Sequence, residues 1–153
     1  MSLQQRITDD TKAALLGGNR FVGDTLRNLR AAFLNEEVAL NKRDEGLSDA
    51  EIEAVIVREV KKRNESAKMY RENNRPELAE PEEQEASILQ EYLPQQLTED
   101  EIRNFVTTAI AETNANGMAA MGQVIGAVKS AAGNSADGAT IARIVKEELS
   151  KQT

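Results

Sequence analysis

The division of the chain is most clearly indicated by the segment Tyr92-Leu93-Pro94-Gln95-Gln96-Leu97-Thr98-Glu99-Asp100-Glu101. Proline cannot continue a helix and disfavours helical backbone in the residue before it, so one helix ends here. Thr98 and Glu101 then have the spacing of a capping box, which is typical of a helix start. No apolar period crosses the stretch. The sequence therefore predicts a boundary between two helical parts of the chain.

Apolar residues recur at helical spacing on both sides of this boundary, and no segment bounded by turns has a strand period. The predicted helices lie near residues 3–15, 22–40, 48–73 and 77–92 before the boundary, and near 98–116, 118–133 and 137–149 after it. We therefore predict an all-α fold. It has an N-terminal four-helix domain (1–93), a linker (94–97) and a small three-helix C-terminal domain (98–153).

Pro81 lies inside the fourth predicted helix. A proline within a helix removes one backbone hydrogen bond and clashes with the preceding turn. From the residues alone we expect a short turn before Pro81 and the main helix after it.

Composition excludes several kinds of site. The chain has no cysteine and no histidine, which rules out disulfides, Ser-His-Asp and Cys-His catalytic groups, and zinc sites built from Cys and His. Neither a phosphate-binding loop nor a G-x-G-x-x-G motif is present. We expect no catalytic residue, no metal and no cofactor. Because the apolar runs fall far short of a membrane span and Met1 to Asp10 are polar, we expect a cytoplasmic protein with no membrane partner.

The net charge of −7 is unevenly distributed. Residues 76–112 hold one basic side chain against ten acidic ones, whereas the segments on either side are each close to neutral. The acidic block lies in a polar run and shows no calcium-loop spacing. An acidic total therefore does not argue against binding of nucleic acid, because the local charge of a face matters more than the sum.

Basic residues gather on the third predicted helix and at the end of the chain. The candidates for phosphate contacts are Arg27, Arg30, Arg58, Lys61, Lys62, Arg63, Lys129, Arg143 and Lys146. Those from 58 to 63 recur at helical spacing, and we expect Arg27 and Arg30 to lie beside them. One interpretation is a stripe that contacts the phosphates of structured RNA. The alternative is a solvated helix face with i,i+4 ion pairs such as Glu59–Arg63.

Two glycines, Gly122 and Gly126, lie one turn apart inside the sixth predicted helix. Each costs a helix roughly 1 kcal/mol relative to alanine, so glycine here indicates a close backbone approach. The approach could come from another helix of the C-terminal bundle. It could also come from an RNA backbone or a protein partner, with Lys129 and the last helix supplying charge.

Several motifs, in this order and spacing, carry a resemblance to a known family. They are Thr25-Leu26-Arg27-Asn28-Leu29-Arg30-Ala31-Ala32, Asn35-Glu36-Glu37, Glu59 to Ser66, Leu78-Ala79-Glu80, Tyr92-Leu93-Pro94, Met121-Gly122-Gln123-Val124-Ile125-Gly126 and Asp137-Gly138. Over nearly its whole length the chain resembles the GatB/YqeY family, and its free-standing YqeY-like members most.

The resemblance implies a role near tRNA. The family includes the tail of the tRNA-dependent amidotransferase B subunit, and related domains are appended to a glutaminyl-tRNA synthetase. The implied partners are tRNA and an amidotransferase or aminoacyl-tRNA synthetase. The implied association is with carbon–nitrogen ligase activity that uses glutamine as amido-N donor. The tail of the B subunit touches tRNA, so the match at Met121, Gly122 and Gly126 implies contact there. An unbroken fourth helix is also implied.

The first hypothesis is therefore a non-catalytic, tRNA-associated helical module whose catalytic partners are separate proteins. Whether the chain has an activity of its own stays open at this level. The alternative hypothesis is a protein–protein adaptor that docks through its acidic block and has no RNA role. Aromatic residues do not alternate with basic ones, so stacking on single strands is not expected, and neither is DNA binding.

Overall fold

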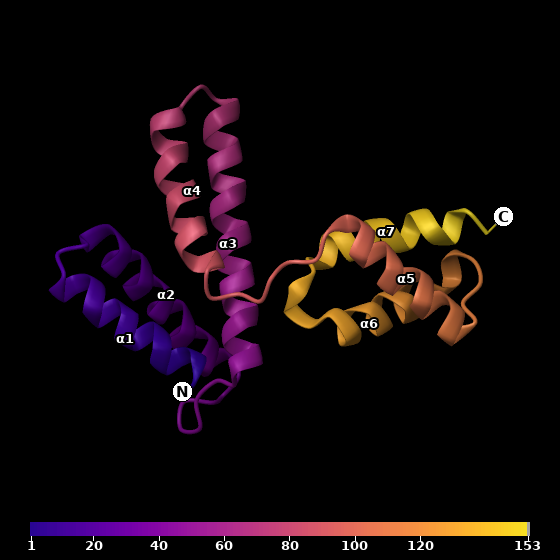
Figure 1. Ribbon diagram of the computed structural model, residues 1–153, viewed down its shortest axis with the longest axis horizontal. Helices are drawn as coiled ribbons and strands as arrows, with labels where there is room; N and C mark the ends of the chain where they lie inside the picture. The colour runs from indigo at the N-terminus through magenta and orange to yellow at the C-terminus, as the bar shows by residue number, and fades with distance from the viewer. Residues whose placement is uncertain (153) are drawn as a thin grey trace. The chain divides into compact units, whose positions relative to one another are not determined.

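A computed structural model describes residues 1–152 and is helical throughout, which confirms the predicted all-α class (Figure 1). The helices are α1 (Leu3–Leu16), α2 (Arg20–Ala39), α3 (Asp49–Glu72), α4 (Pro76–Gln90), α5 (Glu99–Thr113), α6 (Met121–Ala132) and α7 (Gly138–Ser150), with the short 3₁₀ helices η1 (Met118–Ala120) and η2 (Gly133–Ser135). The chain divides into two compact units, Met1–Leu93 with α1 to α4 and Pro94–Thr153 with α5 to α7. Within the described residues, no helix is both long and apolar enough to cross a bilayer.

In the first unit, α1 and α2 form a hairpin that packs against the N-terminal half of α3, and α4 runs back along α3 (Figure 1). The core between them is aliphatic apart from one aromatic ring. It consists of Ile7, Leu26, Leu29, Phe33, Ile52, Val55, Ile56, Val60, Ala86 and Leu89. Beyond Val60 the buried side chains between α3 and α4 are Arg63, Ala67 and Ala79. The half of the α3–α4 pair that lies farthest from α1 and α2 therefore depends on small residues and ion pairs.

The start of α3 is fixed by the predicted capping box and by one lysine. The Ser48 hydroxyl accepts a hydrogen bond from the Glu51 N–H at 3.2 Å, and the Glu51 carboxylate accepts from the Ser48 N–H at 3.0 Å. Lys42 Nζ donates to both oxygens of Glu51 at 2.9 Å. The hydrogen bond from Lys42, followed by those from Ser48, lowers the pKa of Glu51 to about 2. Glu51 thus joins the loop after α2 to the start of α3.

This low pKa gives the unfolding free energy a specific pH dependence. A carboxyl whose folded-state pKa is depressed stabilises the fold above its unfolded pKa and loses that contribution as pH falls toward the folded value. For Glu51 the contribution should disappear between pH about 4.5 and about 2. We expect Glu51→Gln to be less stable than the wild type near neutral pH and to approach it at the acid end, as measured by urea denaturation. A stability difference that did not change with pH would contradict the Lys42–Glu51 pairing.

The prediction of a break at Pro81 is wrong, because α4 runs unbroken from Pro76 to Gln90. Pro76 occupies the first turn, where a missing N–H costs nothing. Pro81 follows shortly after and is exposed, so the carbonyl it leaves unbonded lies near the start of the helix and can reach water. The family resemblance, which implied an unbroken helix, gave the correct result.

The Tyr92-Leu93-Pro94 exit has a structural role in the first unit. Tyr92 Oη donates a hydrogen bond to Asp10 Oδ2 at 2.6 Å, and the Arg6 guanidinium lies over the tyrosine ring at 4.9 Å from its centre. Burial, and then the hydrogen bond to Asp10, raise the pKa of Tyr92. The chain segment that follows α4 is therefore attached to α1.

The second unit is a three-helix bundle with its own core. Its buried residues are Ile102, Val106, Ala109, Ala115, Val124, Val128, Ile141, Ile144, Val145 and Leu149. The capping box at Thr98 and Glu101 is present, but α5 ends at Thr113, earlier than predicted, because Asn114 adopts the left-handed conformation (φ 51°). The N–H of Leu97, in the predicted linker, donates to the Ser135 carbonyl at 2.8 Å, which fastens this part of the segment to the second unit.

Candidate nucleic-acid interface

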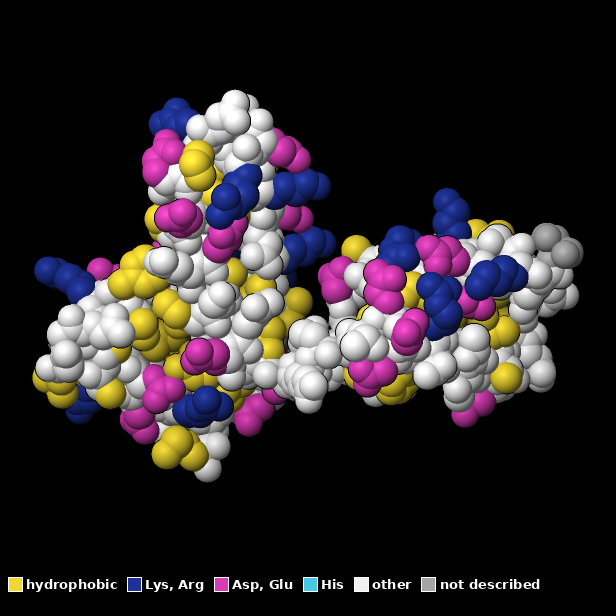
Figure 2. Space-filling view, turned by 45° about the horizontal axis from the view of Figure 1, so that its top comes forward, with side chains coloured by type: hydrophobic (Ala, Val, Ile, Leu, Met, Phe, Trp, Pro, Cys, Tyr) yellow, Lys and Arg dark blue, Asp and Glu magenta, His cyan; other side chains and the backbone are white. Residues whose placement is uncertain are grey.

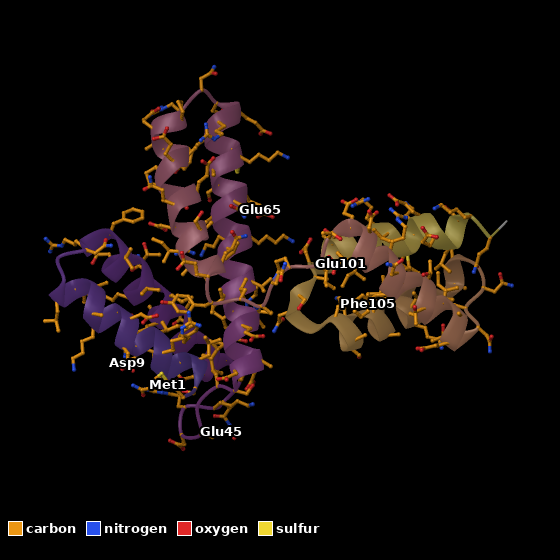
Figure 3. The ribbon with its side chains drawn as sticks, viewed as in Figure 1. Met1, Asp9, Glu45, Glu65, Glu101 and Phe105 are labelled. Atoms are coloured by element: carbon orange, nitrogen blue, oxygen red, sulfur yellow. The ribbon has the colours of Figure 1, made fainter. Side chains whose placement is uncertain are left out.

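The outer face of α3 carries basic side chains that point away from the core (Figure 2). Lys61 is exposed and makes no ion pair within residues 1–152. The Lys62 side chain is 75% exposed, and its Nζ lies 3.9 Å from Glu59. Arg58 donates to Glu36 of α2 at 2.6 Å and stays largely exposed. Glu65 lies on the same side of the helix, away from α4 (Figure 3). Lys61 and Lys62 are thus the cations of this face with most freedom to contact a ligand.

Arg63 does not belong to this face. Its side chain is only 10% exposed, and its Nε donates to Glu85 of α4 at 2.8 Å. Its NH1 donates to the Glu59 carboxylate at 3.3 Å and to the Glu59 carbonyl at 3.1 Å. Arg63 therefore links α3 to α4, and we remove it from the candidate phosphate contacts.

Arg27 and Arg30 also lie apart from the basic side chains of α3. Glu36 marks the side of α2 that faces α3, because its carboxylate bonds Arg58. At about 100° per residue, Arg27 projects on the side of α2 opposite Glu36. Arg30 projects about a third of a turn around the helix from Glu36. Arg27 is also 3.9 Å from Asp24. Arg27 and Arg30 therefore point away from the side of α2 that bonds Arg58.

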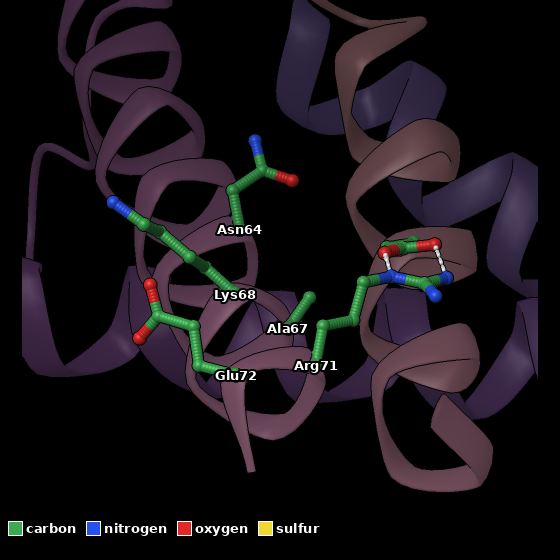
Figure 4. Close-up of a pocket in the computed structure, with 6 residues that line it drawn as sticks. Asn64, Ala67, Lys68, Arg71 and Glu72 are labelled. Carbon is green, nitrogen blue, oxygen red and sulfur yellow. Dashed lines mark hydrogen bonds and ion pairs between the residues drawn. The ribbon is translucent and has the colours of Figure 1, made fainter. Parts of the chain in front are cut away.

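Near the turn that joins α3 to α4, a shallow groove is lined by Asn64, Ala67, Lys68, Arg71, Glu72 and Glu83. Arg71 is held by two hydrogen bonds from its Nε and NH2 to Glu83, at 2.5 and 2.8 Å, which raise the pKa of the arginine and lower that of the glutamate. Figure 4 shows Lys68 directed away from this pair. The donors do not converge on a common point, so the groove forms no anion site.

In the second unit, Gly122 and Gly126 lie on the exposed face of α6. A Cβ atom added at either glycine would meet nothing within 4 Å, beyond the helix's own backbone. Packing inside the unit therefore does not require glycine at these positions, and the interpretation as close helix packing is wrong. Met121 differs from its neighbours, since it is half-buried and packs against the core of the bundle.

The three cations predicted for this region have different surroundings. Lys129 lies against the first turn of α7, because a Cβ at Gly138 would be 3.4 Å from its Cε. Lys146 is exposed and makes no ion pair within the described residues. Arg143 is bonded to Glu99 of α5 and, at 3.0 Å, to Glu147. Arg143 therefore serves partly to join α5 and α7.

Arg103 completes this ion-pair network. It donates to Glu148 at 2.6 Å and to Glu147 at 3.1 Å, which raises the pKa of the arginine. The same bonds lower the pKa values of both glutamates. The network links α5 to α7. Helix α6 takes no part in it, and Lys129 is the one charged side chain in the α6 sequence.

Sequence reasoning did not select the neutral polar residues beside the glycines. Gln123 and Ser130 are exposed on α6, next to Gly122 and Gly126. The signal was present, because Val124 and Val128 mark the buried side and Gly126 lies about 200° around the helix from each. The exposed face of α6 thus offers bare backbone, an amide, a hydroxyl and one ammonium group.

Within residues 1–152, no group of three or more acidic side chains is placed to hold a metal ion.

The second groove of the first unit lies between α2 and α3. Its lining is Asn28, Ala31, Ala32, Asn35, Glu36, Ala39, Val55, Arg58, Glu59 and Lys62. Several of these residues belong to the motifs that carry the family resemblance.

Comparison with known proteins agrees with these motifs. A curated relative from Clavispora lusitaniae, "Altered inheritance of mitochondria protein 41, mitochondrial", is 28% identical over 110 residues. The match covers 70% of this chain and 62% of that protein, so the chain spans less than two thirds of the relative's length. The family described as Yqey-like protein matches residues 4–149, which is nearly the whole chain. The chain therefore belongs to the YqeY-like protein family.

Proposed function

We propose that this protein is a non-catalytic RNA-binding module that associates with tRNA. Its cellular context would be tRNA-dependent amidation or aminoacylation, in which separate proteins carry out the carbon–nitrogen ligation with glutamine as amido-N donor. Family membership and the resemblance to the amidotransferase tail support the direction of this proposal. The observation that carries it is the exposed position of Gly122 and Gly126, with open space where a side chain would lie.

The argument from the glycines is energetic. A glycine inside a helix lowers its stability, and such a cost is expected to persist only where a side chain would obstruct something. Nothing inside the second unit would be obstructed. The obstructed group would therefore belong to a ligand, and an RNA backbone, which proteins contact through shape and the ribose hydroxyl, fits the neutral polar face of α6.

The outer face of α3 would supply the ionic part of binding. Lys61 and Lys62 are exposed. Arg58 bonds Glu36, but most of its side chain is exposed and can also contact a phosphate. With Lys129 and Lys146 they form the reduced set of candidate phosphate contacts. We propose that residues 1–93 and 98–153 act as two domains that bind one RNA. The proposal requires only that tRNA be present, so it fits the predicted cytoplasm as well as the mitochondrial location in the relative's name.

A salt series with tRNA tests the ionic part. Each phosphate contact contributes roughly 0.7–0.9 to the slope of log affinity against log salt. We expect Lys61→Glu/Lys62→Glu to weaken binding and to reduce that slope by about 1.5. The matched control is Lys12→Glu/Arg20→Glu, which changes the net charge equally at a distant turn and should keep the wild-type slope. Equal losses in the two variants would show that only total charge matters and would contradict the assignment.

The adaptor alternative is less well supported by the geometry. Part of the acidic block is engaged in ion pairs within the chain: Glu77 pairs with Arg75, Glu83 with Arg71 and Glu85 with Arg63. The predicted acidic docking surface is therefore smaller than the sequence indicates. A stable protein complex that survives nuclease treatment, formed by a chain that does not bind tRNA, would favour the adaptor.

A further inference from the structure

The turn between α1 and α2 exposes large apolar side chains. Leu16 is 82% exposed, Phe21 is 40% exposed and Leu15 is 38% exposed. Lys12 and Arg20 lie beside these apolar side chains, and the nearest acidic residues in the sequence are Asp9, Asp10 and Asp24. The turn is therefore an apolar tip with cations beside it.

Backbone hydrogen bonds hold this tip in a defined shape. The Asn19 N–H donates to the Ala14 carbonyl at 2.9 Å and the Gly18 N–H to the Leu15 carbonyl at 3.4 Å, with Gly18 at φ +81°. This pattern is the Schellman motif that ends a helix. Asn19 then caps α2 by accepting from the Val22 N–H at 3.3 Å. The conformation of the turn thus does not depend on burial of Leu16.

Close contact between the two helices reinforces the turn. A Cβ at Gly23 would lie 2.4 Å from Leu15 Cδ2, so the Leu15 side chain occupies the space that glycine leaves. Leu15 is therefore partly used to pack α1 on α2. Leu16 has no such role, since most of its surface is exposed.

We propose that this tip binds the surface of an anionic lipid bilayer. Leu16 and Phe21 would enter the boundary between headgroups and acyl chains, and Lys12 and Arg20 would lie among the lipid phosphates. Lys12 precedes Leu16 by one helical turn, and Arg20 is the neighbour of Phe21 in the sequence, so a cation lies in the same turn of helix as each apolar side chain. The contact is peripheral, in keeping with helices that do not span a membrane in the described part of the chain.

A bilayer fits this surface better than a protein groove does. The apolar side chains project from the end of one helix and the start of the next, with Gly18 between them and nothing within 4 Å of its Cβ position. The space around Gly18 is open, and a lipid surface receives exposed apolar side chains at such a turn without a matching pocket. The prediction of no membrane partner considered only spanning segments, and this proposal replaces it.

Exposed apolar residues elsewhere on the same hairpin provide the matched control. Leu34 is 57% exposed on α2, but lies about 20 Å along the helix from the turn. If the tip inserts, Leu34 stays in water. If any exposed leucine sufficed, its loss would matter as much as that of Leu16.

Co-sedimentation of the full chain with vesicles tests the proposal. We expect binding to phosphatidylcholine vesicles that contain phosphatidylserine and much weaker binding to phosphatidylcholine alone. Leu16→Ser should lower the partition coefficient about tenfold, and Leu34→Ser should leave it unchanged. Lys12→Glu/Arg20→Glu should remove the preference for phosphatidylserine, whereas Lys61→Glu/Lys62→Glu should keep it. Unaltered far-UV circular dichroism would confirm that Leu16→Ser folds.

Four results would overturn the proposal. They are no binding of the wild type to phosphatidylserine vesicles at low salt, wild-type binding by Leu16→Ser, equal losses for the two leucine variants, and a dimer in sedimentation velocity that Leu16→Ser dissolves. The last result would make the tip a contact between copies of the chain. The proposal is independent of RNA binding, so Leu16→Ser should keep the wild-type affinity for tRNA.

Discussion

Replacement of Gly122 and Gly126 by alanine should stabilise the protein and weaken its affinity for tRNA. Nothing lies within 4 Å of either added methyl group, so the fold has no reason to resist the change. Alanine in place of a helical glycine gains up to about 1 kcal/mol. Gly126 should show most of this gain, because Gly122 is only the second residue of α6. Thermal unfolding of the second unit should therefore shift upward by several degrees, roughly 4–8 °C for each kcal/mol.

The effect on RNA should have the opposite sign. A methyl group inserted into a close contact costs about 1–3 kcal/mol, which corresponds to a loss of affinity of about 5-fold to 140-fold. The control is Ala111→Met, which adds a larger group on the exposed side of α5 in the same unit and should leave affinity unchanged. A double alanine variant that is more stable and binds tRNA as well as the wild type would show that the glycines do not mark a contact.

Loss of Arg63 should destabilise the first unit strongly without a specific effect on RNA. The guanidinium is nearly buried between two carboxylates, Glu59 and Glu85, whose side chains are also mostly covered. Removal of one partner from a buried ion pair typically costs about 3 kcal/mol, because the remaining charge stays without compensation. We expect Arg63→Met to lower the urea midpoint markedly, with tRNA affinity unchanged under conditions where the variant is folded.

A second substitution separates the ion pair from other effects of Arg63. Arg63→Met/Glu85→Leu removes one of the two carboxylates that lose their partner and should recover part of the lost stability. Wild-type stability of Arg63→Met together with loss of tRNA binding would reverse the conclusion and return Arg63 to the phosphate contacts.

The helices were predictable where local chemistry determines them. Both capping boxes, at Ser48 and Thr98, form as the sequence indicated, and Asp137 caps α7 by accepting from the Thr140 N–H at 3.2 Å. Pro81 was misjudged, because the carbonyl that it leaves unbonded belongs to Glu77, which is exposed and can bond to water instead. The early end of α5 depends on a left-handed Asn114, which the sequence allows but does not require.

The candidate interface was harder to predict, because it depends on which side of each helix is buried. Arg63 sits in the run Lys61-Lys62-Arg63 and resembles its neighbours by type. It falls three residues after Val60 and four before Ala67, which are both buried, and this spacing places it on the core side of α3. The acidic partner on α4 could not be identified without the packing of the two helices.

The most direct test of the central claim is the affinity of the purified wild-type chain for tRNA, compared with a DNA hairpin of equal length across a salt series. The account predicts saturable binding to tRNA that weakens steeply with salt, and clearly weaker binding to DNA. No binding to tRNA at low salt, or equal binding to both nucleic acids, would contradict a module that recognises RNA.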